Sequence, residues 1–126
     1  PIELDPMFDS RAWWMLDMVK IQELMAKGEF RDFSSSKPPE LPGLRKSILK
    51  IIEDAKSRHG LDDSKIVLGG FSQGSMLALD VALNYPGTFG GLVLWSCAFI
   101  NEVAWTELAK QHDPLNGNLA VFFLCV

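Results

Sequence analysis

Two stretches of the chain repeat apolar residues at the spacing of a helix face. The first, residues 10–27, predicts a helix that Gly28 ends. A loop rich in serine and proline follows over residues 30–43. The second stretch, residues 44–59, is the clearer amphipathic helix, because basic residues fill its last turn and Gly60 follows as a stop. Its predicted buried stripe consists of Leu44, Ile48, Ile51, Ile52 and Ala55.

Three short apolar runs further along the chain predict buried strands, because polar residues do not alternate with the apolar ones. These runs cover residues 66–69, 91–96 and 119–125. Helices are predicted between them over residues 72–85 and 103–111. An alternation of continuous apolar strands with helices is typical of an α/β protein whose parallel sheet carries helices on both faces.

The sequence Gly70-Phe71-Ser72-Gln73-Gly74 lies where the first predicted strand meets the helix that follows it. A G-x-S-x-G pattern in this place is typical of a nucleophile elbow, in which a sharp turn holds the serine hydroxyl clear of the backbone. Glycines are expected at both ends, because a side chain at either one would crowd the turn. Ser72 is therefore the candidate nucleophile, and the Gln73 N–H at the helix start is the candidate oxyanion-hole donor.

Glycines before a helix also occur in nucleotide-binding proteins, where they bring the backbone close to phosphate groups. A phosphate-binding loop requires lysine after the second glycine, but position 75 is serine, and the glycine spacing of a dinucleotide-binding fold is absent. A chance Gly-Ser-Gly turn before a helix is the remaining alternative. The apolar strand before the turn and the helical pattern after it favour the elbow.

The residues around the elbow, Lys65 to Ser75, resemble the corresponding segment of the phospholipase/carboxylesterase family of α/β-hydrolases, which includes acyl-protein thioesterases. The segments Arg11 to Asp17 and Gly91 to Ser96 are similar to two further parts of that family. This resemblance implies a three-layer α/β-hydrolase fold with a mostly parallel sheet, and hydrolysis of carboxylic esters or thioesters with medium or long acyl groups. It also makes Trp13 and Trp14 candidates for substrate binding, as part of an acyl-binding wall. From helical spacing alone, both tryptophans would be ordinary core residues.

Length and composition limit the classes of protein that fit. The 126 residues suffice for one domain, but they are few for an α/β-hydrolase, a fold of about 200 residues or more. A net charge of −4 without a basic cluster argues against nucleic acid as a partner. No apolar run approaches the roughly 20 residues that a membrane span needs. Cys97 and Cys125 lack metal-ligand spacing, so we expect reduced thiols in a cytoplasmic protein, with no metal and no cofactor.

A serine hydrolase also needs a histidine base and an acid, and the sequence holds two histidines. His59 precedes Ser72, and its place at a helix end is a sufficient structural explanation. Asp80 and His112 follow Ser72 in the formal order of a triad, but a strand separates the levels of His112 and Ser72 by about 20 Å. Neither histidine is therefore expected to serve Ser72.

The family resemblance places the acid and the base after the last predicted strand, and the second oxyanion donor before Pro1. We therefore expect residues 1–126 to form one partial domain, truncated at both ends, whose open sheet edges favour self-association. Three interpretations fit. The chain is a serine carboxylesterase, lysophospholipase or acyl-thioesterase acting on a small acyl substrate, an inactive hydrolase-like module that binds a ligand, or a piece of a longer protein.

Overall fold

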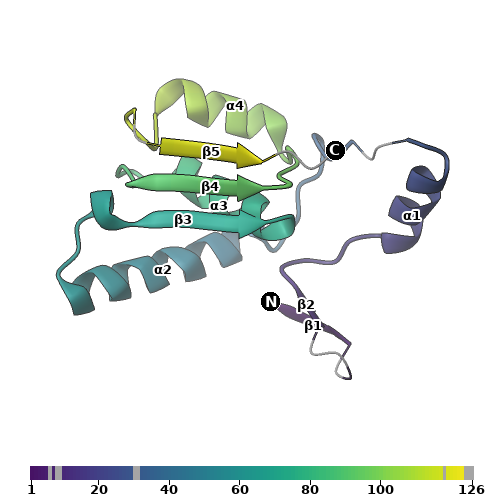
Figure 1. Ribbon diagram of the computed structural model, residues 1–126, viewed down its shortest axis with the longest axis horizontal. Coiled ribbons are helices and arrows are strands. Elements are labelled where there is room, and N and C mark those ends of the chain that lie inside the picture. The colour runs from purple at the N-terminus through teal and green to yellow at the C-terminus, as the bar shows by residue number, and fades with distance from the viewer. Residues whose placement is uncertain (6, 8–9, 30–31, 118, 124–126) are drawn as a thin grey trace.

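A three-stranded parallel sheet forms the centre of the fold (Figure 1). Its strands stand in the order β3 (Val67–Phe71), β4 (Gly91–Trp95) and β5 (Leu119–Phe123). The strands pair without a register shift, so that Phe71 lies beside Trp95 and Trp95 beside Phe123 at their carboxyl ends. The computed structural model describes residues 1–5, 7, 10–29, 32–117 and 119–123.

Three helices accompany the sheet, namely α2 (Leu41–His59), α3 (Gln73–Asn84) and α4 (Glu102–Gln111). Helix α3 passes behind β3 and β4, contacts both strands, and packs between α2 and α4 (Figure 1). The described residues therefore have a mixed α/β fold with a parallel β-α-β unit, as the alternation of apolar strands and helices predicts.

The core lies between α3 and the sheet. Every residue of α3 from Ser75 to Leu83 is buried, so this helix is enclosed on all sides. Large side chains from the strands and from α4 fill the remaining space. Burying a large apolar side chain stabilises a fold by about 1.5–3 kcal/mol, so these contacts fix α3 against the sheet. The largest fully buried apolar side chains are those of Trp105, Phe89, Leu94, Ile100 and Val81.

The opposite face of the sheet is exposed among the described residues. The side chains of Val67 and Phe71 on β3 are 62% and 70% exposed, and that of Trp95 on β4 is 45% exposed. They alternate along the strands with Leu92 and Leu94 of the core, as the pleat of a strand requires. Within the described ranges, helices therefore cover only the α3 side of the sheet, and the prediction of helices on both faces is confirmed for that side alone.

The amino-terminal segment differs from its predicted single helix over residues 10–27. Strands β1 (Ile2–Asp5) and β2 (Ser10–Ala12) form an antiparallel pair, and only α1 (Met18–Ala26) is helical. The prediction fails because pairing with β1 and burial of Trp14, which is 3% exposed, outweigh the helical spacing. Helix α1 lies apart from the sheet in Figure 1.

Helix α2 follows its prediction with two corrections. It begins three residues early at Leu41, because Pro42 in the first turn is compatible with a helix start. Ile51 is exposed rather than buried, while its neighbour Ile52 is buried, so the contact stripe is narrower than the spacing predicts. Gly60 adopts a positive φ of 63° after the last turn, which confirms the predicted stop.

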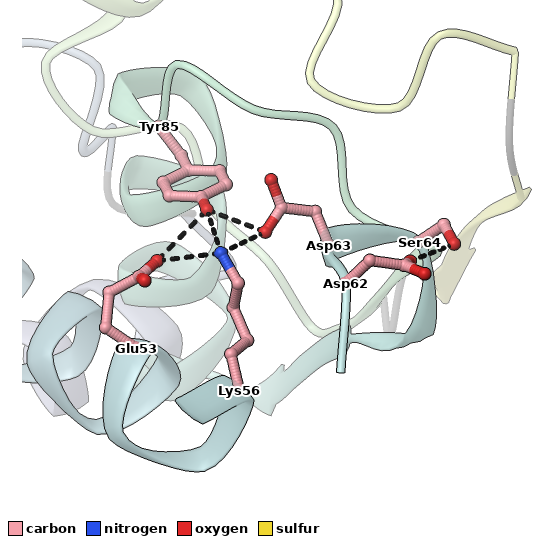
Figure 2. A network of polar contacts seen from close by, with 6 residues as sticks. All are labelled: Glu53, Lys56, Asp62, Asp63, Ser64 and Tyr85. Atoms are coloured by element: carbon pink, nitrogen blue, oxygen red, sulfur yellow. Dashed lines mark hydrogen bonds and ion pairs between the residues drawn. The ribbon is translucent and has the colours of Figure 1, made fainter. Parts of the chain in front are cut away.

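A polar network joins the end of α2 to the end of α3 and to the short turn η1 (Asp63–Lys65) before β3 (Figure 2). The Lys56 ammonium lies 2.5 Å from an Asp63 oxygen, 2.9 Å from the Tyr85 hydroxyl and 2.9 Å from Glu53. The Tyr85 hydroxyl donates to Asp63 at 2.8 Å. Lys56 holds the pKa of Asp63 below its usual range, while burial raises the pKa of Tyr85. The network therefore fastens the elements before the amino end of β3.

Candidate active site

Ser72 is the single residue between β3, which ends at Phe71, and α3, which begins at Gln73. Its φ of 52° and ψ of −118° lie in a region that residues with side chains rarely adopt. The Ser72 N–H donates to the Trp95 carbonyl at 2.9 Å and so extends the pairing of β3 with β4. Ser75 donates its N–H and its hydroxyl to the Ser72 carbonyl, at 3.0 and 2.6 Å. Hydrogen bonds on both sides thus hold the unusual backbone.

The two glycines of the pattern differ in what surrounds them. A Cβ at Gly70 would lie 2.2 Å from the carbonyl carbon and oxygen of Gly74, so the turn excludes any side chain there. A Cβ at Gly74 would meet only the indole nitrogen of Trp13, at an ordinary contact distance of 3.7 Å. The expectation that both positions require glycine is therefore wrong for Gly74, because its α-carbon faces open space beside Trp13.

The Gln73 side chain connects the elbow to a distant part of the chain. Its Oε1 accepts a hydrogen bond from the Trp13 N–H at 3.0 Å, and its Nε2 donates to the Trp14 carbonyl at 2.8 Å. Sequence reasoning assigned a role only to the Gln73 N–H and missed the side chain. No local pattern could have indicated it, because the partners lie 60 and 59 residues away.

A cleft of about 420 Å³ adjoins Ser72. This volume falls in the range of about 300–1,000 Å³ that is usual for sites of small ligands. Ser72 and Gln73 line the cleft together with Phe71 and residues 13–16, so the four candidate residues lie at one place. Trp14 also belongs to the hydrophobic core and Trp13 packs against that core, so the substrate-binding and core interpretations of these tryptophans are compatible.

A family model described as Phospholipase/Carboxylesterase matches residues 15–116, which is most of the chain. The chain belongs to this family. The match includes the elbow, β3, α3, β4 and α4, and the observed β-α-β unit is consistent with part of an α/β-hydrolase fold. Trp13 and Trp14 lie just before the matched residues. No solved structure matches the chain.

Both histidines of this family member are held away from Ser72. His59 ends α2 on the exposed surface before η1. His112 follows α4, and its Nε2 lies 3.2 Å from the Gly87 carbonyl in the connection that leads into β4. Ser72 stands at the carboxyl end of β3, whereas both histidines precede the amino ends of strands. This placement agrees with the prediction that neither histidine serves Ser72, which stays a prediction.

Asp80, the acid in the formal triad order, has a structural role. Its side chain is fully buried on α3 and accepts hydrogen bonds from Arg45 Nε at 2.7 Å and from the indole nitrogen of Trp105 at 2.9 Å. A buried carboxylate needs such partners, because leaving it unpaired is costly. Asp80 thus joins α2, α3 and α4 rather than acting beside Ser72.

The two cysteines and the remaining polar groups complete the surroundings of the site. Cys97, just after β4, carries a free half-buried thiol whose pKa is raised by burial. Cys125 lies outside the described residues. Within the described ranges, no three His, Cys, Asp or Glu side chains gather in a way that could hold a metal ion. In the same part of the chain, no helix is long and apolar enough to cross a membrane.

Proposed function

We propose that Ser72 is the nucleophile of a serine hydrolase that cleaves carboxylic esters or thioesters. The observation that carries the proposal is the unusual backbone of Ser72, with φ 52°, at a strand–helix junction beside a cleft. Such a conformation costs about 1–3 kcal/mol and is concentrated at functional sites. Glycine would adopt it at little cost, so a serine here is better explained by its hydroxyl than by the needs of the turn.

In the proposed reaction, Ser72 Oγ attacks the acyl carbonyl carbon and its proton passes to a base. The carbonyl oxygen becomes an oxyanion, which accepts a hydrogen bond from the Gln73 N–H at the positive end of α3. The intermediate then expels the alcohol or thiol, which takes the proton from the base, and water hydrolyses the acyl-enzyme. The base is a histidine other than the two in this sequence, because His59 and His112 precede the amino ends of strands, whereas Ser72 stands at a carboxyl end.

The proposed substrate is a small acyl ester or thioester, as for a carboxylesterase, lysophospholipase or acyl-thioesterase. Support comes from the composition of the cleft, where Trp13, Met15 and Phe71 offer apolar surface close to Ser72. Flexible thioether and aromatic side chains accommodate acyl chains of different shape. The proposed steps use neither a metal nor a cofactor.

The second candidate function is a hydrolase-like module that binds an acyl ligand without turnover. The observation that favours it is the placement of His59 and His112, which leaves Ser72 without a base among the described residues. The same cleft would then hold a ligand, and Ser72 would be a binding residue. This module predicts saturable binding of an acyl ligand and no catalysed release of product.

Labelling with a fluorophosphonate distinguishes the two functions, because it modifies a serine only where a base activates the hydroxyl. The matched control is Ser96, which follows β4 as Ser72 follows β3 and also has a positive φ, 51°. In the complete enzyme, which holds the base, we expect label on the wild type and on Ser96→Ala, and none on Ser72→Ala. Label that persists in Ser72→Ala overturns the assignment of the nucleophile.

Hydrolysis of a p-nitrophenyl ester tests turnover directly. The Ser72→Ala variant at equal concentration is expected to reduce the rate to background, since mutation of a triad serine typically costs about 10⁶-fold in kcat. Equal rates in the complete wild-type enzyme and in its Ser72→Ala variant would contradict the proposed hydrolase function. Ligand binding in both proteins would then favour the binding module.

We also propose that the chain forms part of one three-layer α/β-hydrolase domain. The exposed apolar side chains of Val67, Phe71 and Trp95 support a second layer on that face of the sheet. Among the described residues β3 pairs with β4 alone, and this edge supports self-association, because an edge strand offers backbone groups to another chain. Sedimentation velocity at increasing protein concentration tests self-association, and a constant monomer contradicts it. The cytoplasmic location stays a prediction.

A further inference from the structure

The Gln73 side chain makes a pair of hydrogen bonds that only a carboxamide of this length can make. Oε1 accepts from the Trp13 N–H and Nε2 donates to the Trp14 carbonyl, at 3.0 and 2.8 Å. The carboxamide supplies one acceptor and two donors, so it can satisfy a backbone N–H and a backbone carbonyl at once. A carboxylate offers acceptors alone, and a thioether offers neither strong donor nor strong acceptor.

The segment that Gln73 holds has no regular structure of its own. Residues 13–16 lie between β2 and α1, so no helix or sheet ladder fixes their backbone. Burial of the Trp14 side chain anchors the segment to the core, and the two bonds from Gln73 anchor its backbone to α3. Residues 13–16 are also one wall of the cleft beside Ser72.

Two functions therefore meet in one residue. The main chain of Gln73 starts α3 next to Ser72, where the proposed oxyanion forms, and its side chain holds the cleft wall. Because both groups belong to Gln73, this one residue sets the distance between the reacting carbonyl and the cleft wall. A wall displaced by even about 1 Å is enough to weaken a positioned reaction strongly.

We infer that the Gln73 side chain is a positioning residue, which fixes the wall formed by residues 13–16 and thereby sets the preference for longer acyl chains. This inference rests on the proposed function of Ser72. It concerns the side chain alone, since the substitutions that test it keep the Gln73 N–H. Gln73 acts on the acyl chain through Trp13 and Trp14.

The first measurement is hydrogen exchange at the Trp13 amide, which does not depend on activity. We expect Gln73→Met, which has no strong acceptor, to speed exchange at this amide about three- to tenfold, the effect of losing one ordinary hydrogen bond. Gln73→Glu keeps an acceptor for the Trp13 N–H and loses only the donor to the Trp14 carbonyl, so it should speed exchange at Trp13 less than Gln73→Met does. The control Gln111→Glu makes the same chemical change on an exposed side chain of α4 and should leave the Trp13 rate unchanged. Circular dichroism verifies that the variants fold. Gln73→Met removes both hydrogen bonds, whereas Gln73→Glu removes only the bond to the Trp14 carbonyl.

The second measurement is the ratio of kcat/KM for p-nitrophenyl octanoate to that for p-nitrophenyl acetate. We expect this ratio to fall about fivefold in the Gln73 variants, because each contact with a longer chain depends on the wall, while Gln111→Glu keeps the ratio of the wild type. An unchanged ratio overturns the inference even if exchange is faster, since a merely structural residue would lower both values alike. An unchanged exchange rate at Trp13 in Gln73→Met also overturns it. If the wild type hydrolyses neither ester, the proposed function fails, while the exchange rate still decides whether Gln73 holds the wall.

Discussion

Replacing Gly70 by alanine is the sharpest test of the turn before Ser72. The added Cβ would stand 2.2 Å from the carbonyl carbon and oxygen of Gly74 and 2.5 Å from the Ser75 nitrogen. All three are backbone atoms of the first turn of α3, so no side chain can rotate to make room. The turn itself must open, and the strand–helix junction that sets the Ser72 backbone must shift with it.

The magnitude follows from the rigidity of these neighbours. Inserting a methyl group into a packed site typically costs about 1–3 kcal/mol, and we expect the upper end, because the opposing atoms belong to a buried helix. The matched variant Gly74→Ala has the opposite expectation. Its Cβ meets only Trp13 at 3.7 Å, and alanine is favoured over glycine in a helix by about 0.5–1 kcal/mol.

Urea unfolding followed by circular dichroism measures both variants, with the free energy of unfolding extrapolated to water. We expect Gly70→Ala to be about 3 kcal/mol less stable than the wild type, and Gly74→Ala to be about 0.5 kcal/mol more stable. A Gly70→Ala protein as stable as the wild type refutes the geometry of the turn. A Gly74→Ala protein as unstable as Gly70→Ala refutes the distinction between the two glycines.

Three further predictions concern single groups. Ser72→Gly should raise the free energy of unfolding by about 1 kcal/mol, because glycine adopts a φ of 52° without backbone strain, whereas Ser72→Ala should not raise it. Equal stability of the two variants in urea unfolding would contradict backbone strain at Ser72. Arg45→Ala should lower the free energy of unfolding by about 3 kcal/mol, because it leaves the fully buried carboxylate of Asp80 without its ion pair. The double variant Arg45→Ala/Asp80→Asn should recover part of this loss in the same assay, and no recovery would contradict a charge effect. Lys56 lowers the pKa of Asp63 in the folded state, so the folded protein binds fewer protons at Asp63 than the unfolded one. The stabilisation from this ion pair is therefore complete above the unfolded pKa of about 4, and it is lost as the pH falls through the folded pKa. Asp63→Asn should therefore flatten the acid dependence of urea midpoints measured from pH 7 to pH 3, and an unaltered dependence would exclude the pair as its source.

The elements that were predicted from the sequence are those with local signals. Gly60 ends α2 through a conformation that glycine adopts readily, and the apolar runs of β3 and β4 need no knowledge of their partners. The hairpin of β1 and β2 was missed because its stability comes from pairing rather than from spacing. Ile51 and Ile52 both fit a helix face, and only contact with the neighbouring helix decides which of them is buried.

The candidate site shows the same difference between features with local sequence signals and features that depend on distant contacts. Ser72 and the Gln73 N–H follow from five consecutive residues, so the sequence alone indicated them. The hold of the Gln73 side chain on Trp13 could not be predicted, because it crosses 60 residues and involves backbone atoms that carry no sequence identity. For Gly74 the pattern predicted too much: it indicated that a side chain would crowd the turn, but the structure has room for one there.

The apolar face of the sheet has a practical consequence for how this protein is studied. Dyes such as anilinonaphthalene sulfonate fluoresce on exposed apolar surface, and their binding is commonly taken as a sign of a molten state. Val67, Phe71 and Trp95 present such surface in the native fold. Where no further layer and no second copy covers this face, the folded protein should bind the dye and fluoresce before any heating. Its dye-based melting curve would then fall on heating, whereas that of a protein without exposed apolar surface rises. Near-ultraviolet circular dichroism of the aromatic side chains is the probe that separates the folded chain from a molten one, because a molten state keeps its backbone signal.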